Sequence, residues 1–196
     1  MPNTLIVYAT TDGQTRKISE RIQQTLHDNG LETTLVDVDK AAELDPASFD
    51  GVIAGASVRY GKHDPKMARF LDGNRDAIAR IPNAFFSVNL IARKPEKRNL
   101  DGNKYLRKFL DRLSFSPMHV EIIAGKLDYP SYRFIDRIMI RMIMKITDGP
   151  TEGTEVIEYT DWDQVDSFAA RMAEAIVSSD TSARASHKPT GNQGAT

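Results

Sequence analysis

Five short and almost wholly apolar runs alternate along the chain with longer amphipathic segments, and this alternation constrains the fold more than any other feature. The apolar runs cover residues 5–9, 33–38, 51–56, 84–88 and 120–124. The segments between them repeat apolar residues at helical spacing, and we expect helices within 15–29, 64–80, 101–113 and 161–178. Strands that are apolar on both faces and alternate with helices are typical of a parallel sheet covered on both sides. The sequence therefore predicts one doubly wound α/β domain with a five-stranded parallel sheet.

The 196 residues fit one such domain with additions near its end. We expect the folded domain over residues 1–177, with an insertion at about 129–150. Residues 178–196 include no large apolar side chain, so we expect a disordered tail there. The chain has no uncharged apolar stretch of about 18 residues, and its N-terminus has no basic segment with a cleavage site. These features predict neither a transmembrane helix nor a signal peptide, and favour a cytoplasmic protein.

Charge and cysteine content exclude several classes of function. The 26 Lys and Arg residues nearly cancel the 27 Asp and Glu residues, and a net charge of −1 argues against nucleic-acid binding through bulk charge. The chain has no Cys, which excludes disulfides, thiol nucleophiles and Cys-ligated metal centres. Its four His residues are scattered without the spacing of metal ligands, so we interpret them as surface or structural. Only His63 adjoins a loop with a predicted binding role, and proton transfer there stays an alternative.

The turn after the first predicted strand, residues 9–16, leads directly into the first predicted helix. It contains three threonines and one glycine, and such a loop at a helix N-terminus can hold a phosphate. It matches neither the glycine pattern of dinucleotide folds nor the Walker loop. Its position alone leaves open whether it is a phosphate site or an ordinary capped helix start.

Two further loops, residues 55–63 and 87–94, follow the third and fourth predicted strands. Ligands of open parallel sheets bind beyond the carboxyl ends of the strands, where the strand order reverses. Gly55 and Gly61 would let the backbone approach a flat ligand, and Tyr60 would stack on it. Each loop alone is more typical of a plain turn, but the three loops together favour a ligand site.

The residues of these loops resemble those of a known family. Segment 10–15 is similar to the flavodoxin phosphate loop, with Asp12 where Thr is usual. Segments 55–61, 86–98 and 159–162 resemble the flavodoxin-like, quinone-dependent protoporphyrinogen IX dehydrogenases, the oxygen-independent bacterial protoporphyrinogen oxidases. The resemblance runs from about residue 5 to residue 175 and includes the insertion.

This resemblance implies a flavodoxin-like sheet of strand order 2-1-3-4-5 with non-covalently bound FMN as the cofactor. It also implies oxidation of protoporphyrinogen IX to protoporphyrin IX in haem biosynthesis, with a respiratory quinone, menaquinone or ubiquinone, as the electron acceptor. No catalytic acid or base is expected, because the flavin carries the redox step. Carried over onto this sequence, the cofactor contacts of the family fall on Thr10, Asp12, Gly13, Gln14, Thr15, Ser57, Val58, Arg59, Tyr60, Gly61, Asn89, Leu90, Ile91 and Ala92.

The departure at Asp12 matters because a carboxylate beside a phosphate repels it. Two interpretations stay open at this point. Asp12 either turns away as a cap of the following helix, or has its charge offset by Arg16.

A basic segment, residues 93–112, follows the third of these loops and contains eight basic residues against three acidic ones. The substrate that the resemblance implies carries two propionates, which guanidinium groups can grip in a bidentate way. We therefore expect substrate contacts at Arg93, Lys94, Lys97 and Arg98. A solvated helix face is the alternative, and we favour it for residues 104–112.

Residues 131–147 within the insertion form a strongly amphipathic and basic segment. A stripe of four basic residues on one side opposes an apolar arc on the other. Such a helix suits the surface of an anionic membrane better than a span across it, so we expect a peripheral protein on the inner face of the cell membrane. The residues expected to contact the membrane are Arg133, Arg137, Arg141 and Lys145. The alternative is a helix packed against the sheet or buried in the dimer interface of a homo-oligomer.

Other function classes also stay open. One is a flavodoxin-type electron carrier that docks protein partners, and another is an FMN-dependent NAD(P)H:quinone reductase. Carriers of this type present an acidic face, whereas basic residues such as Arg59, Lys62 and Arg93 gather near the predicted flavin. This pattern favours the porphyrinogen dehydrogenase over the electron carrier.

Overall fold

The computed structural model describes residues 1–128, Lys145 and residues 156–186. Five parallel strands build the central sheet in the order β2-β1-β3-β5-β6. They are β1 (Asn3–Ala9), β2 (Glu32–Asp37), β3 (Gly51–Arg59), β5 (Asn83–Asn89) and β6 (His119–Ala124). The short strand β4 (Lys62–His63) is antiparallel to the end of β3. With β4 set aside, this is the order 2-1-3-4-5, and the predicted fold class is confirmed.

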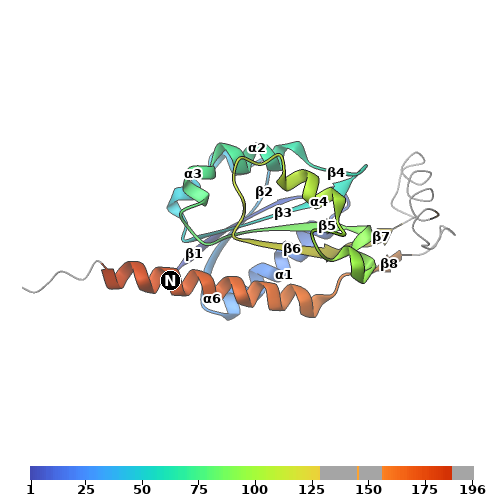
Figure 1. The fold of residues 1–196 in the computed structure, drawn as a ribbon. Helices are drawn as coiled ribbons and strands as arrows, with labels where there is room; N and C mark the ends of the chain where they lie inside the picture. Colours follow the sequence, from blue (N-terminus) through green and yellow to red (C-terminus); the bar gives the residue numbers. More distant parts are fainter. Residues whose placement is uncertain (129–144, 146–155, 187–196) are drawn as a thin grey trace, which may run out of the picture.

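Helices cover both faces of the sheet (Figure 1). Helices α1 (Gln14–Asp28) and α6 (Trp162–Ser186) cover one face, and α2 (Pro65–Gly73), α3 (Arg75–Ile78) and α4 (Lys104–Leu110) cover the other. Short 3-10 helices join them: η1 (Ala41–Glu43), η2 (Pro46–Ser48), η3 (Leu90–Arg93) and η4 (Pro95–Lys97). The helical segment predicted within 64–80 is divided into α2 and α3 at Asn74, whose ψ of 13° leaves the helical range.

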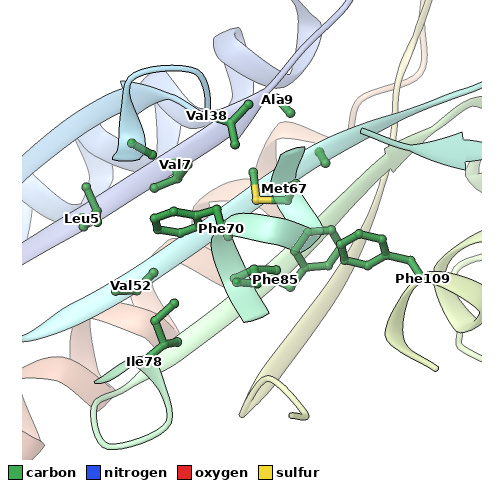
Figure 2. Packing of buried hydrophobic residues seen from close by; sticks show 14 of the residues in the cluster. Leu5, Val7, Ala9, Val38, Val52, Met67, Phe70, Ile78, Phe85 and Phe109 are labelled. Carbon is green, nitrogen blue, oxygen red and sulfur yellow. The ribbon is translucent and has the colours of Figure 1, made fainter. Parts of the chain in front are cut away.

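The strands are apolar throughout because successive side chains enter two different cores. Leu5 and Val7 point to the side of α2, α3 and α4, while Ile6 between them points to the side of α1 and α6. Neighbouring Phe85 and Phe86 divide in the same way. Figure 2 shows the first of these cores, where Phe85 lies beside Phe70 and Phe109.

Gly55 is needed for the packing of Phe86. The sequence had suggested instead that Gly55 lets the backbone approach a ligand. A Cβ atom at Gly55 would lie 1.9 Å from Cζ of Phe86, so only glycine leaves room for that ring. The expectation that Gly55 faces a flat ligand is therefore wrong.

A second, two-stranded sheet carries the insertion. Strands β7 (Lys126–Asp128) and β8 (Val156–Glu158) pair antiparallel, with Asp128 opposite Val156. The residues on either side of the segment 129–155 are therefore neighbours in this small sheet. The predicted membrane-contact residues Arg133, Arg137 and Arg141 lie outside the described residues, while Lys145 is helical and exposed. Within the described parts of the chain, no helix combines the length and the apolar character that crossing a membrane requires.

The last helix, α6, is longer than predicted. It runs to Ser186, so the expectation of disorder is wrong for residues 178–186. Residues 187–196 lie outside the described residues. Once the first turns of α6 are packed, each further residue adds a hydrogen bond at little cost, and no Gly or Pro interrupts the sequence before Pro189.

Candidate functional site

A cleft that encloses about 830 Å³ of space, with the open solvent at its mouth included, lies at the carboxyl edge of the sheet, where the loops after β1, β3, β5 and β6 meet. Its lining residues are Thr10, Asp12, Gln14, Thr15, Ser57, Val58, Arg59, Tyr60, Gly61, Val88, Asn89, Leu90, Ile91, Tyr105, Gly125 and Lys126. The structure thus gathers the predicted cofactor residues in one place, except Gly13 and Ala92.

The loop after β1 offers hydroxyl groups that have no partner of their own. The Oγ1 atoms of Thr10 and Thr15 are buried and have no hydrogen-bond partner within the described structure, and Thr15 is 0% exposed. Helix α1 starts directly after Gly13 (φ +80°), and no described side chain caps its first turn. Buried polar groups are nearly always paired, so unpaired hydroxyls beside an uncapped helix start fit a bound anion.

Asp12 is paired across the cleft with Arg59, at the end of β3. The distance from Arg59 Nη1 to Asp12 Oδ2 is 2.8 Å. Arg16 instead bonds Glu20 one turn further along α1, also at 2.8 Å. Asp12 does not cap α1 and Arg16 does not offset its charge, so neither interpretation of Asp12 that the sequence left open is correct.

Tyr60 and Gly61 form the two-residue turn of the β3–β4 hairpin. Both have positive φ, +50° and +74°, as a type I′ turn requires. A tyrosine is costly in this conformation, yet its ring is 54% exposed and lies 5.3 Å from the Arg59 guanidinium. Tyr105 of α4 is the neighbour of this turn, since a Cβ at Gly61 would lie 3.2 Å from its ring. Tyr60 of the hairpin and Tyr105 of α4 thus both line the cleft beside this turn.

The wall after β5 is held by a buried chain of hydrogen bonds. Asn89 Oδ1 accepts from the Ala92 backbone N–H at 3.1 Å and from Asn103 Nδ2 at 3.3 Å. Asn89 Nδ2 donates to Ser87 Oγ at 3.1 Å, and that hydroxyl lies 2.8 Å from His63 Nε2. We call these four side chains, His63, Ser87, Asn89 and Asn103, the amide wall; Asn89 lines the cleft, and the other three lie behind it in the described structure. Ala92 serves this wall through its backbone while its side chain is fully buried, which explains why it does not line the cleft.

His63 is 7% exposed and packs beside the stacked rings of Phe85 and Phe109, 5.7 Å and 4.7 Å from their centroids. This burial lowers the pKa of His63 to about 4, so the imidazole is neutral at neutral pH. His63 is also absent from the lining of the cleft among the described residues. Both observations favour a structural role for His63 over proton transfer to a ligand in the cleft.

The four basic residues predicted to contact substrate do not line the cleft in the described structure. Arg93 Nη1 donates to the Leu90 carbonyl at 3.2 Å, and Arg98 Nε donates to the Ala92 carbonyl at 2.9 Å. These two side chains therefore help to fix η3. Lys94 links η3 to η4, and Lys97 is the last residue of η4.

Four lining residues were missed from the sequence: Val88, Tyr105, Gly125 and Lys126. Gly125 and Lys126 follow β6. The rule that ligands bind beyond the carboxyl ends of parallel strands would have found them if it had also been applied to this strand. Val88 is the penultimate residue of a strand whose loop was predicted. No sequence pattern pointed to Tyr105 as a site residue, because its segment has the spacing of an ordinary amphipathic helix.

The flavodoxin domain family matches residues 5–154. The protoporphyrinogen IX dehydrogenase [quinone] of Escherichia coli K12 is 41% identical over 170 residues, which cover 87% of this chain and 94% of that protein. The chain belongs to this dehydrogenase family. The relative from Leishmania major with the same name is 40% identical over 88% of this chain and 75% of that protein.

The fold of this family member is also that of solved flavodoxins. A point mutant of flavodoxin from Pseudomonas aeruginosa superposes with a TM-score of 0.53 at 12% identity, over 89% of this chain and 99% of that one. Flavodoxin-like domains hold FMN at the switch point between β1 and β3. The unpaired hydroxyls of Thr10 and Thr15 lie at this point and fit the FMN phosphate. FMN is therefore the cofactor of this protein.

Proposed function

We propose that this protein oxidises protoporphyrinogen IX to protoporphyrin IX, with FMN as the cofactor and a respiratory quinone, menaquinone or ubiquinone, as the electron acceptor. This reaction belongs to haem biosynthesis. The observation that carries the proposal is the match to the quinone-dependent dehydrogenase of Escherichia coli, which spans 94% of that protein at 41% identity. The same match covers 87% of this chain, so it is not confined to the flavin-binding loops.

The side chains of the cleft have binding and positioning roles. Bound FMN supplies two-electron redox chemistry, so the protein needs to orient the ring system and control access to it. Thr10 and Thr15 would bind the phosphate, and the amide wall fixes η3, which would help to orient the flavin. The carboxylate of Asp12 and the ammonium of Lys126 are each held in an ion pair, with Arg59 and Asp128, both at 2.8 Å. None of these four groups is needed as a general acid or base.

The substrate enters at the mouth of the cleft in this proposal. Tyr60 and Tyr105 offer flat apolar surface to the macrocycle. Lys94 and Lys97 follow η3 in the chain, and their charges would suit the propionates of the substrate. Arg93 and Arg98 act mainly by fixing η3 through its carbonyl groups, although their charge adds to the attraction.

The position of the insertion supports quinone access from a membrane. Lys126, which lines the cleft, pairs in register with Glu158, so the segment 129–155 starts and ends beside the cleft. Its basic and apolar sequence suits the interface of an anionic membrane. We infer that the protein binds the inner face of the cell membrane peripherally, through Arg133, Arg137, Arg141 and Lys145.

An anaerobic assay with purified FMN-loaded protein tests the activity. Protoporphyrinogen IX should become fluorescent porphyrin at a rate that depends on an added menaquinone or ubiquinone analogue. A normal rate without any quinone would contradict the proposed acceptor. Absence of porphyrin formation with either quinone, together with electron transfer to a redox protein, would favour the carrier instead.

Vesicle sedimentation tests the membrane proposal separately. Changing Arg133, Arg137, Arg141 and Lys145 together to Gln should abolish binding to vesicles that contain anionic lipid, while FMN stays bound. The matched control changes four exposed basic residues of another surface, Lys104, Arg107, Lys108 and Arg112, to Gln. Equal binding by both variants would contradict the assignment of the membrane surface to the insertion.

A further inference from the structure

The pair of Asp12 and Arg59 brings a negative charge into the phosphate end of the cleft. Asp12 lies on the same loop as Thr10 and Thr15, whose buried hydroxyls are unpaired in the described structure. The side chains of Asp12 and Arg59 are 33% and 23% exposed, so water screens the pair only in part. A dianionic phosphate bound here would meet the carboxylate at close range.

The other cations of the first helix are engaged elsewhere. Arg16 bonds Glu20 at 2.8 Å, and Lys17 bonds Glu158 at 3.2 Å. Arg59 reaches Asp12 from a different element, 47 residues further along the chain. Arg59 therefore contributes a compensation of the Asp12 charge that neither Arg16 nor Lys17 supplies.

We propose that Arg59 determines the preference of this cleft for a phosphorylated flavin, by neutralising Asp12. Without Arg59 the carboxylate would repel the phosphate of FMN but not riboflavin, which has the same ring system and no phosphate. Without Asp12, this carboxylate would no longer oppose the attraction of the Arg59 charge for the phosphate. This inference concerns cofactor selection and does not rest on the proposed substrate.

Arg59 also contacts the ring of Tyr60, with its guanidinium 5.3 Å from the ring centroid. Its removal is thus expected to weaken the binding of any flavin that lies against Tyr60. The ratio of the FMN and riboflavin affinities cancels this shared effect. That ratio is therefore the quantity to measure.

The experiment uses full-length apoprotein and titrates FMN and riboflavin by quenching of flavin fluorescence. The variants are Arg59→Leu, Asp12→Asn and the double variant. Arg59→Leu should lower the preference for FMN over riboflavin by about tenfold, and Asp12→Asn should raise it. The double variant restores a neutral site, so its preference should return to within about threefold of the wild type.

Two further measurements separate charge from folding. Arg59→Lys keeps the charge and should keep the preference, and high salt should restore part of the preference that Arg59→Leu loses. Circular dichroism of each variant verifies its fold, and equilibrium dialysis against equal FMN and riboflavin gives the ratio independently. The proposal is overturned if Arg59→Leu weakens both flavins equally, or if the double variant discriminates no better than Arg59→Leu.

Discussion

The two walls of the cleft use their polar groups in opposite ways. On the phosphate loop, residues 10–15, the hydroxyls of Thr10 and Thr15 are buried without a partner in the described structure. On the amide wall, the side chains of Ser87, Asn89 and Asn103 bond one another and the backbone. An unpaired buried hydroxyl costs stability and is available to a ligand, whereas a paired network makes a wall rigid. One wall is therefore built to bind the cofactor and the other to shape its surroundings.

The largest effect is expected for Asn89→Ala, which removes the central side chain of the amide wall. The change removes partners of the Ala92 N–H, of Asn103 and of Ser87, all buried. We expect a loss of about 2–3 kcal/mol in the free energy of unfolding, measured by urea denaturation of the apoprotein. FMN and riboflavin should both bind more weakly, because η3 loses its support.

The control for this change is Asn99→Ala, which removes an exposed hydrogen bond to the Gly102 N–H in the next turn. It should cost less than about 1 kcal/mol. Equal costs for the two variants would show that the amide wall contributes no more than a surface contact.

Acid should weaken the amide wall through His63. Its pKa is about 4 in the folded protein and about 6.5 when unfolded, so the unfolded state binds more protons between these values. The stability that neutral His63 contributes is present above pH 6.5 and is lost as the pH falls toward 4. Between pH 7 and pH 5 we expect a loss of about 2 kcal/mol in the free energy of unfolding.

The variant His63→Phe isolates this effect, since a phenyl ring can pack beside Phe85 and Phe109 without titrating. Urea denaturation at pH 7 and pH 5 should show a smaller loss for the variant than for the wild type. Identical losses would mean that carboxylates, and not His63, cause the acid sensitivity.

On the phosphate loop, Thr15→Val should weaken FMN binding without lowering stability, unlike the substitutions in the amide wall. The hydroxyl has no partner to lose in the described apoprotein, so the free energy of unfolding should stay the same or rise slightly. FMN affinity should fall by about tenfold, as for the loss of one hydrogen bond to a charged group, while riboflavin affinity stays unchanged. A destabilised apoprotein with normal FMN affinity would contradict the assignment of Thr15 to the phosphate.

The smallest effect is expected for Arg16→Met. Arg16 bonds the exposed Glu20 and leaves Asp12 to Arg59. Water screens a surface pair of this kind, so the free energy of unfolding should hardly change, and FMN affinity should change less than about twofold. A large and specific loss of FMN binding would show that Arg16 acts on the phosphate loop after all.

The five strands and their parallel sheet could be predicted because a strand that is buried on both faces has a continuous apolar sequence. The strand order came from the resemblance of the loops to a flavodoxin-like family. The loops of the cleft could be predicted because the carboxyl ends of parallel strands share one edge. The partner of Asp12 could not, because Arg59 lies 47 residues away and Arg16 is the nearer cation in the sequence. Tyr105 was missed for a similar reason, since only the folded chain brings α4 beside Gly61.

The most direct test of the proposed function is a single half-reaction without oxygen. FMN-loaded protein is mixed with protoporphyrinogen IX while flavin absorbance and porphyrin fluorescence are followed together. We predict that the flavin band bleaches as porphyrin forms, and that an added menaquinone or ubiquinone analogue restores it. A flavin band that stays unchanged in the presence of substrate, although dithionite reduces it, would contradict the assignment of this protein as a protoporphyrinogen IX dehydrogenase.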